Sequence, residues 1–329
     1  MTEATEPVTV PRKKGGRRRL LRWTVTILVV GLVGYFFVRS LARNWDRVAE
    51  EHLAFDPWWI VATVLFALAV PLTGILCGRM IMTLQPGARV TVSEAVAVQC
   101  ASWLLKYIPG QVGSVVNKVV WAGKKGISRT IIVITFIYEN VFLQIVSIVP
   151  SVVILAASLG PGIFGDNVTT LLLPVLALVP LGLVLWRPFF HRLVNLPAKR
   201  VLKQPVPRES FLSSGQTLRY LVGFVGPRIL NGIGFVLIAH SVADVGPSDW
   251  LPFAAAYTLA GAVGILAVLV PSGLGVREAV VVVVLSQYVS TPEAIVISLL
   301  ARLCSTIGDA VIALIYAVVR QRIDKEIRP

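Results

Sequence analysis

The stretch Val270-Pro271-Ser272-Gly273-Leu274-Gly275 interrupts an apolar segment that runs from about residue 252 to about residue 288. Proline removes a backbone donor from a helix, and glycine tolerates the turn that follows such a break. We therefore interpret this segment as two half-helices joined by a Pro/Gly turn, which form a re-entrant hairpin. The apolar segment from about residue 93 to about residue 121 is broken in the same way at Tyr107-Ile108-Pro109-Gly110. The sequence thus predicts two such hairpins.

The composition around these breaks is typical of a membrane protein. Hydrophobic residues make up 56% of the 329 residues, charged residues only 15%, and the mean hydropathy is +0.78. A helix needs about 20 apolar residues to cross the hydrocarbon core of a bilayer. Six unbroken segments meet this requirement: residues 20–38, 58–82, 130–156, 168–186, 218–239 and 292–319. We expect an all-α integral membrane protein with about six full transmembrane helices plus two opposed re-entrant helical hairpins.

The distribution of Lys and Arg predicts the orientation in the membrane. These residues gather in the N-terminal tail, in residues 123–129, in residues 187–219 and in the C-terminal tail, whereas residues 160–167 and 241–251 have none. Cytoplasmic loops carry an excess of positive charge. Both termini are therefore expected in the cytoplasm, in a multi-pass protein of the plasma (inner) membrane. The net charge of +14 follows from these basic loops, so we expect no nucleic-acid partner.

The two hairpins are part of an internal repeat. Ile108-Pro109 and Val112-Gly113 match Val270-Pro271 and Leu274-Gly275 at an offset of 162 positions, which also relates the flanking spans. Each half, about residues 20–160 and 166–320, has three spans and one hairpin, so the second half is expected upside down. Tails of residues 1–19 and 321–329 flank this single membrane domain. Inverted repeats with broken helices are a recurring transporter design, and chance similarity among hydrophobic segments is the alternative.

At each break a new half-helix is expected to begin inside the membrane, near Gln111 in the first half and near Val276 in the second. The first amide groups of a helix lack partners and its dipole is positive there, so such an end attracts phosphate or carboxylate. Two opposed half-helix ends, at Pro109 and Pro271, therefore predict a site for an anionic headgroup. The alternative is that both breaks are packing kinks.

Polar and ionisable residues within the apolar segments are candidates for lining this site, because a charge inside the membrane is costly. They comprise Lys106 and Tyr107 beside the first break, Arg277 and Glu278 beside the second, and Asn117, Glu139, Arg228 and Arg302 elsewhere. Glu139 and Arg302 lie at nearly equivalent depth in the two halves, which suggests a pair across the interface. Structural ion pairs are the alternative. Snorkelling from a helix end accounts for Lys118.

The remaining sequence motifs indicate no catalytic or metal-binding site. The sequence has no Ser/His/Asp arrangement, no paired carboxylates at fixed spacing, no phosphate-binding loop and no metal-ligand cluster. We therefore expect no enzyme, no ATP-driven pump, no metal and no cofactor. Gly74-Ile75-Leu76-Cys77-Gly78 matches GxxxG and is expected to be a packing face. Cys77, Cys100 and Cys304 are expected to be core residues.

Two stretches resemble the signatures of a known family. The first is Trp103-Leu104-Leu105-Lys106-Tyr107-Ile108-Pro109-Gly110-Gln111-Val112-Gly113, followed by Lys124-Lys125-Gly126-Ile127-Ser128, and the second is Pro271-Ser272-Gly273-Leu274-Gly275-Val276-Arg277-Glu278. They are similar to those of the flippase-like transmembrane domain of lysylphosphatidylglycerol synthase, which also occurs as stand-alone membrane proteins. The second signature is usually P-G-G-L-G-x-R-E, so Ser272 departs from it. The resemblance implies site-shaping positions at Pro109, Gly110, Gly113, Gly273, Gly275, Arg277 and Glu278.

The resemblance also implies movement of a lipid headgroup between leaflets: aminoacylated phosphatidylglycerol in the synthase, and polyprenyl-phosphate-linked sugars elsewhere. No aminoacyl-transfer domain is expected here, and so no lysyl-lipid synthesis. We predict a translocase for an anionic phospholipid or a polyprenyl-phosphate-linked lipid. The alternative is a non-transporting membrane partner of a glycosyltransferase or of a cell-envelope assembly, and a homo-oligomer is a further partner to test. An intramembrane lipid-modifying enzyme is the third class.

Overall fold

The computed structural model describes residues 56–107, 112–160, 179, 182–183, 185–201, 206–266, 273 and 275–327. The predicted span 20–38 lies outside these residues, as does most of the predicted span 168–186. In the described part the regular secondary structure is helical and includes no strand. The predicted all-α class is therefore confirmed.

Four long helices correspond to four of the predicted spans. They are α3 (Trp58–Leu84), α6 (Arg129–Leu159), α9 (Ser214–His240) and α12 (Thr291–Ile327). Each grows from an apolar run and begins within a few residues of the predicted boundary, and all but α12, which continues to Ile327, also end within a few residues of it. Among the described residues, five helical stretches are long and apolar enough to cross a membrane, and the fifth is Pro247–Leu266. That stretch contains the first arm of the second broken segment.

Each broken segment folds as two helices that pack against each other. In the first, α4 (Val92–Leu104) continues into a 3-10 turn, η1 (Leu105–Tyr107), and α5 (Val112–Lys124) follows. In the second, α10 (Trp250–Leu266) packs against α11 (Val276–Leu285). The helices after the breaks thus begin at Val112 and Val276, where the sequence predicts them.

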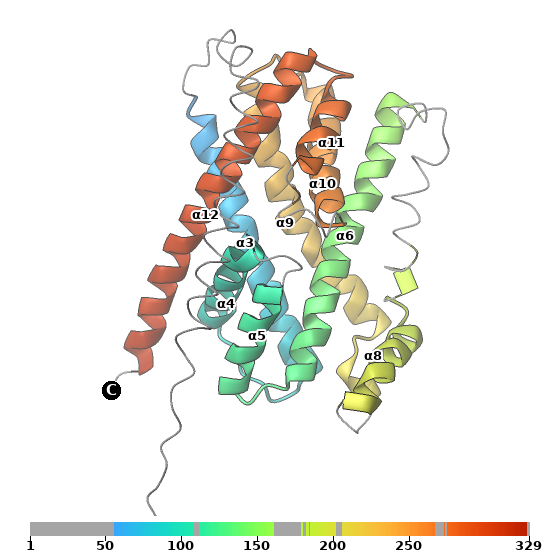
Figure 1. The fold of residues 1–329 in the computed structure, drawn as a ribbon, viewed down its shortest axis with the longest axis vertical. Helices are drawn as coiled ribbons and strands as arrows, with labels where there is room; N and C mark the ends of the chain where they lie inside the picture. Colours follow the sequence, from blue (N-terminus) through green and yellow to red (C-terminus); the bar gives the residue numbers. More distant parts are fainter. Residues whose placement is uncertain are drawn as a thin grey trace, which may run out of the picture.

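The two helix pairs lie at opposite ends of the bundle. Figure 1 shows α4 and α5 in the lower half, beside the end of α3, and α10 and α11 in the upper half, beside the end of α9. The long helices α3, α6, α9 and α12 run the length of the bundle between them. Both pairs therefore reach into one bundle from opposite directions.

The helix contacts repeat between the two halves. The α3–α4, α4–α5 and α5–α6 contacts of the first half have counterparts in α9–α10, α10–α11 and α11–α12. The contacts across the halves also match, since α4 packs on α12 as α10 packs on α6. Helices α3 and α9 occupy equivalent positions and pack directly against each other. The helix contacts of the first half thus have equivalents in the second half.

Glycines of α3 allow the close contact with α4. A Cβ atom at Gly74 would lie 2.7 Å from Gln99 Cβ, and one at Gly78 would lie 2.8 Å from Ala95 Cβ. The predicted role of the GxxxG motif as a packing face is therefore confirmed. Cys77, Cys100 and Cys304 are buried and unpaired, as expected for small core residues.

The basic segment from residue 187 is a helix rather than the predicted loop. Helix α8 (Arg187–Val201) lies at the lower end of the bundle in Figure 1, as do the α5–α6 connection and the end of α12. Phe190 of α8 is buried, with its ring centroid 4.9 Å from that of Tyr138 on α6 and 5.3 Å from that of Phe211. Aromatic packing therefore holds α8 in place, and the basic segments gather at one end.

Candidate functional site

The first break is tied to the last helix of the chain. Lys106, in η1, forms an ion pair with Asp309 of α12, with 2.8 Å between Lys106 Nζ and Asp309 Oδ1. Trp103 Nε1 donates a hydrogen bond of 2.9 Å to the same oxygen, and the Lys106 ammonium lies 4.5 Å from the centre of the Trp103 ring. The end of α4 is therefore fixed to the second half of the molecule by a partly buried charge pair.

The second break depends on glycine. Gly273 and Gly275 have φ angles of +65° and +81°, which residues with a Cβ rarely adopt. A Cβ atom at Gly273 would lie 2.8 Å from Gly264 Cα, so the backbone of the break touches α10 directly. Gly275 N donates a hydrogen bond of 2.7 Å to Glu278 Oε2, which caps the start of α11. The chain thus supplies its own carboxylate to the first amide of this helix.

Arg277 is held beside the second break without a carboxylate partner among the described residues. Its guanidinium lies 5.1 Å from the centre of the Tyr257 ring on α10, a cation–π contact. Its stem passes over Gly264, where an added Cβ would lie 2.5 Å from Arg277 Cγ. The side chain is half-buried. Packing against α10 therefore positions this cation, and no carboxylate of the described residues compensates its charge.

Arg228 of α9 is a second cation without a carboxylate partner among the described residues. Its Nη2 donates a hydrogen bond of 3.3 Å to the Leu143 carbonyl on α6, and its Nε is buried with no hydrogen-bond partner. Arg228 and Arg277 lie close enough for their charges to repel each other. Gln144 follows Leu143 on α6, and its Oε1 is also buried with no hydrogen-bond partner among the described residues. Unpaired donors and acceptors of this kind normally have a ligand or water.

Glu139 and Arg302 are each paired within their own half of the molecule. Glu139 of α6 forms an ion pair with Lys118 of α5, and it accepts a hydrogen bond of 2.6 Å from Gln99 Nε2 of α4. Arg302 of α12 lies 3.9 Å from Glu278 of α11. The predicted pair between Glu139 and Arg302 is therefore wrong, because each residue finds a partner on the adjacent hairpin arm.

Lys118 is likewise not a snorkelling residue. Its side chain is 10% exposed and points to Glu139 in the interior rather than to a helix end. Asn117, its neighbour on α5, donates a hydrogen bond of 3.0 Å to Ser102 Oγ of α4 and joins the two arms of the hairpin. Asn117 thus contributes to packing of the hairpin rather than to the charged cluster.

The charges around the two breaks do not balance. Arg302 and Arg277 lie close enough to Lys106 for their charges to act on it, so the cluster spans both breaks. Cations outnumber anions among the ionisable residues that lie within the apolar segments and around the two breaks: Lys106, Lys118, Arg228, Arg277 and Arg302 against Glu139, Glu278 and Asp309. The excess lies on Arg228 and Arg277. The arrangement is therefore suited to an anion.

Several predicted site residues cannot be placed, and some contacting residues were not predicted. Pro109, Gly110 and Pro271 lie outside the described residues, as does the side chain of Tyr107, while Gly113 lies in the first turn of α5. Asp309, Gln99, Trp103 and Tyr257 contact the predicted charged residues but were not among the predicted site residues. Asp309 and Gln99 share the signal that identified the others, since each is polar within an apolar segment.

The comparison with family models matches the lysylphosphatidylglycerol synthase TM region over residues 23–313. The chain belongs to this family. The match includes both broken segments, helices α3, α6 and α9, and α12 as far as residue 313, so the resemblance extends well beyond the two signatures. The comparison with curated proteins finds no relative. Family membership agrees with a multi-pass helical membrane protein.

Proposed function

We propose that this member of the lysylphosphatidylglycerol synthase TM region family is a flippase-like lipid translocase for an anionic headgroup. The observation that carries the proposal is Arg277, a cation positioned at the second break with no carboxylate partner among the described residues. Arg228 adds a second charge nearby that no carboxylate of the described helices compensates. An anionic phospholipid or a polyprenyl-phosphate-linked lipid supplies the phosphate that these guanidiniums bind well.

The two helix pairs give this site access from both ends of the bundle. In the proposal, α4–α5 and α10–α11 are re-entrant hairpins of an inverted repeat, which meet the headgroup from opposite leaflets. The phosphate contacts Arg277 and Arg228, while the lipid tails stay in the bilayer. The contact symmetry between the halves supports two equivalent access routes. Because Glu278 caps the first amide of α11, the guanidiniums rather than that amide carry the binding.

The proposed orientation places the basic end in the cytoplasm. The α5–α6 connection, α8 and the end of α12 lie at the same end of the bundle. Basic residues are enriched in cytoplasmic loops, so this end faces the cytoplasm of a plasma (inner) membrane protein. In this orientation α4–α5 opens to the cytoplasmic leaflet and α10–α11 to the outer leaflet.

A headgroup-translocation assay with the full chain in liposomes tests the function. Vesicles with a trace of phosphatidylglycerol carrying a nitrobenzoxadiazole group on one acyl chain are treated with dithionite, which reduces only outer-leaflet probe. We expect the protein to make the inner-leaflet pool accessible, and Arg277→Ala to slow this at least tenfold. Arg219→Ala is the matched control, because Arg219 is an exposed arginine of α9.

The rival class, a membrane partner of a glycosyltransferase, gives a different result. Equal probe accessibility in empty vesicles and in vesicles with protein would reject the translocase. Stable co-purification of the chain with such an enzyme would then favour the partner class. We propose further that the protein carries out no bond-breaking step, so the probe lipid should be recovered chemically unchanged.

A further inference from the structure

Gln144 lies at the centre of α6, and only one side of its amide has a partner. The residue is 3% exposed. Its Nε2 donates a long hydrogen bond of 3.4 Å to the Ala262 carbonyl of α10. Its Oε1 is buried with no hydrogen-bond partner in the part of the chain that the structure describes. Buried polar atoms normally have a partner, and inside a membrane no bulk water supplies one, so this oxygen requires a donor.

The contact with α10 sets the orientation of this amide. The Ala262 carbonyl oxygen accepts a hydrogen bond, so it faces the NH₂ group of Gln144. If the amide oxygen and nitrogen exchanged places, two acceptors would lie 3.4 Å apart and face each other, which is unfavourable. The atom of Gln144 that lacks a partner is therefore the acceptor.

Three polar side chains converge where α6 packs on α10. Gln144 contacts α10 at Ala262. The stem of Arg277 passes over Gly264, two residues farther along the same helix. Arg228 donates a hydrogen bond to the carbonyl of the residue that precedes Gln144 on α6. The acceptor of Gln144 therefore lies within one helical turn of the points where both cations of the proposed phosphate site are held.

A phosphodiester cannot satisfy this acceptor. Its oxygens only accept hydrogen bonds, so they can bind the guanidiniums of Arg228 and Arg277 but not Gln144 Oε1. The donor must therefore come from another group of the bound headgroup. An ammonium group would donate, but the two neighbouring guanidiniums repel it. A hydroxyl group donates without a charge, and so it fits this position better.

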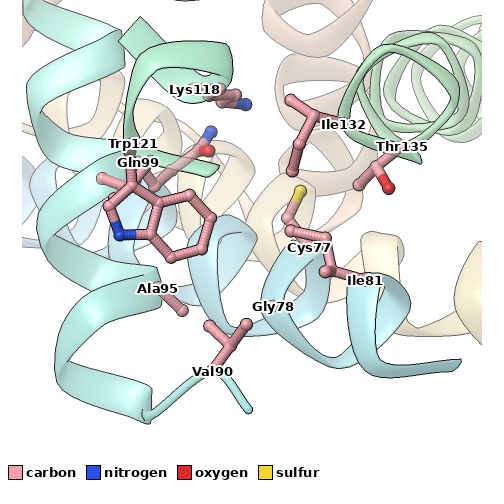
Figure 2. Close-up of a pocket in the computed structure, with 12 residues that line it drawn as sticks. Cys77, Gly78, Ile81, Val90, Ala95, Gln99, Lys118, Trp121, Ile132 and Thr135 are labelled. Atoms are coloured by element: carbon pink, nitrogen blue, oxygen red, sulfur yellow. The ribbon is translucent and has the colours of Figure 1, made fainter. Parts of the chain in front are cut away.

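The cavity at the first hairpin does not offer a second place for such a group. It lies between α3, the first hairpin and the start of α6, and its volume is about 20 Å³. Figure 2 shows largely apolar side chains around it, among them Val90, Trp121 and Ile132. Such a volume holds about one water molecule, so a headgroup does not fit there.

We propose that Gln144 recognises a hydroxyl group of the transported headgroup, so that the substrate is a phosphodiester lipid with a neutral, hydroxylated headgroup; this rests on the proposed translocase function. Arg277 and Arg228 bind the phosphate, and Gln144 Oε1 accepts a hydrogen bond from the hydroxyl. Because this oxygen is shielded in the structure, the headgroup reaches it when the α10–α11 hairpin moves away from α6. The glycerol of phosphatidylglycerol and the sugar of a polyprenyl-phosphate-linked lipid share this chemistry.

A probe that lacks the hydroxyl groups tests this recognition. Phosphatidylmethanol with the same labelled acyl chain keeps the phosphodiester and its single negative charge. In the liposome assay we expect the wild type to move the phosphatidylglycerol probe about fivefold faster, the effect of one neutral hydrogen bond. Gln144→Met keeps the length of the side chain but removes the amide, so it should bring the ratio of the two rates to about one.

Asn140→Met is the matched control for this substitution. Asn140 is an amide one turn earlier on α6, and its Nδ2 donates a hydrogen bond of 2.9 Å to the Phe136 carbonyl of the same helix. Its removal takes the same chemical group from α6 but leaves the acceptor of Gln144 in place. The ratio of the two rates should therefore stay at the wild-type value.

The outcomes separate this proposal from the function itself. Equal rates for the two probes in the wild type would overturn hydroxyl recognition and leave the translocase intact, and so would an unchanged ratio in Gln144→Met. Absence of probe movement in every sample would reject the translocase, and the recognition with it. The comparison of the two probes in the wild type needs no variant, so it decides the question even if Gln144→Met fails to fold.

Competition distinguishes the two sources of a hydroxylated headgroup. An excess of unlabelled phosphatidylglycerol or of an unlabelled polyprenyl-phosphate-linked hexose is added to vesicles with the labelled phosphatidylglycerol probe, and unlabelled phosphatidylmethanol is the reference. The lipid that slows the probe most in the wild type identifies the preferred headgroup. Its advantage over phosphatidylmethanol should be lost in Gln144→Met. If neither hydroxylated lipid competes better than phosphatidylmethanol, the proposal is wrong.

Discussion

Lys106, at the end of the first hairpin arm, forms a 2.8 Å ion pair with Asp309, which lies in the last helix of the other half. The pair joins the two halves at the depth where the first hairpin turns. Its side chains are 20% and 11% exposed, so it is more strongly desolvated than a surface pair. Any movement of the α4–α5 hairpin relative to α12 must stretch or break this contact.

Asp309→Asn should destabilise the protein, because it removes the carboxylate from a partly buried lysine. The asparagine oxygen can still accept the Trp103 hydrogen bond, so the substitution mainly removes the charge that pairs with Lys106. We expect a loss of about 3 kcal/mol, at the low end for breaking a buried pair. Thermal unfolding in detergent measures it. Lys106→Met/Asp309→Asn should recover most of the stability, and a double variant as unstable as the single one would show that the pair is not the cause.

Headgroup charge should decide which lipid moves fastest. Arg277 and Arg228 have no carboxylate partner in the described structure, so a phosphodiester with net charge −1 should bind better than a zwitterion. A charge-assisted hydrogen bond contributes about 1.5–3 kcal/mol, which is tenfold or more. Phosphatidylglycerol and phosphatidylcholine probes with the same labelled chain are compared in the liposome assay, which gives the ratio of their translocation rates. Arg277→Gln should bring the ratio toward one, and a preference that survives this substitution would place the recognition elsewhere.

The start of each helix after a break was predictable from the residues alone. Pro271 and Gly275 interrupt an apolar run, and a helix can begin directly after them. The start of α11 at Val276 therefore follows from these neighbouring residues. The span of α3 follows from an uninterrupted apolar run in the same way. These features depend on neighbours in sequence, which is why the sequence determines them well.

The partner of Glu139 was not predictable in that way. Glu139 and Arg302 lie at equal depth in the two halves, which suggested that they pair. The rotation of α6 about its axis instead directs Glu139 to Lys118 of α5, in the same half. Rotation about a helix axis is set by packing over the whole interface, here including the glycines that bring α3 against α4. Helix α8 was missed for a related reason. Its basic residues suggested a loop, whereas buried Phe190 shows that one face packs on the bundle.

Gly74→Ala should loosen the α3–α4 contact. The new Cβ would lie 2.7 Å from Gln99 Cβ and 2.8 Å from the Ala95 carbonyl oxygen, so backbone must move to admit it. Overpacking of this kind costs about 1–3 kcal/mol. Thermal unfolding in detergent gives the loss. Gly123→Ala is the matched control, because nothing lies within 4 Å of its added Cβ. Equal melting temperatures for the two variants would contradict the packing role.

Gly264→Ala should impair lipid movement without removing any charge. Its Cβ would lie 2.5 Å from Arg277 Cγ and 3.1 Å from Cδ, so the arginine stem must leave its place beside Tyr257. Misplacing a binding cation lowers transport because the guanidinium no longer meets the phosphate in its fixed geometry. We expect at least a tenfold slower probe movement in the liposome assay, with a melting temperature that falls only modestly.

The control for this prediction lies one turn earlier on the same helix. An added Cβ at Gly261 meets nothing within 4 Å, and alanine is favoured over glycine in a helix by about 1 kcal/mol. Gly261→Ala should therefore transport at the wild-type rate with equal or greater stability. If Gly264→Ala also transports normally, the position of Arg277 over Tyr257 does not matter for the headgroup. Slow transport in Gly264→Ala alone would instead make the fixed position of this cation, beyond its charge, a requirement for moving the lipid.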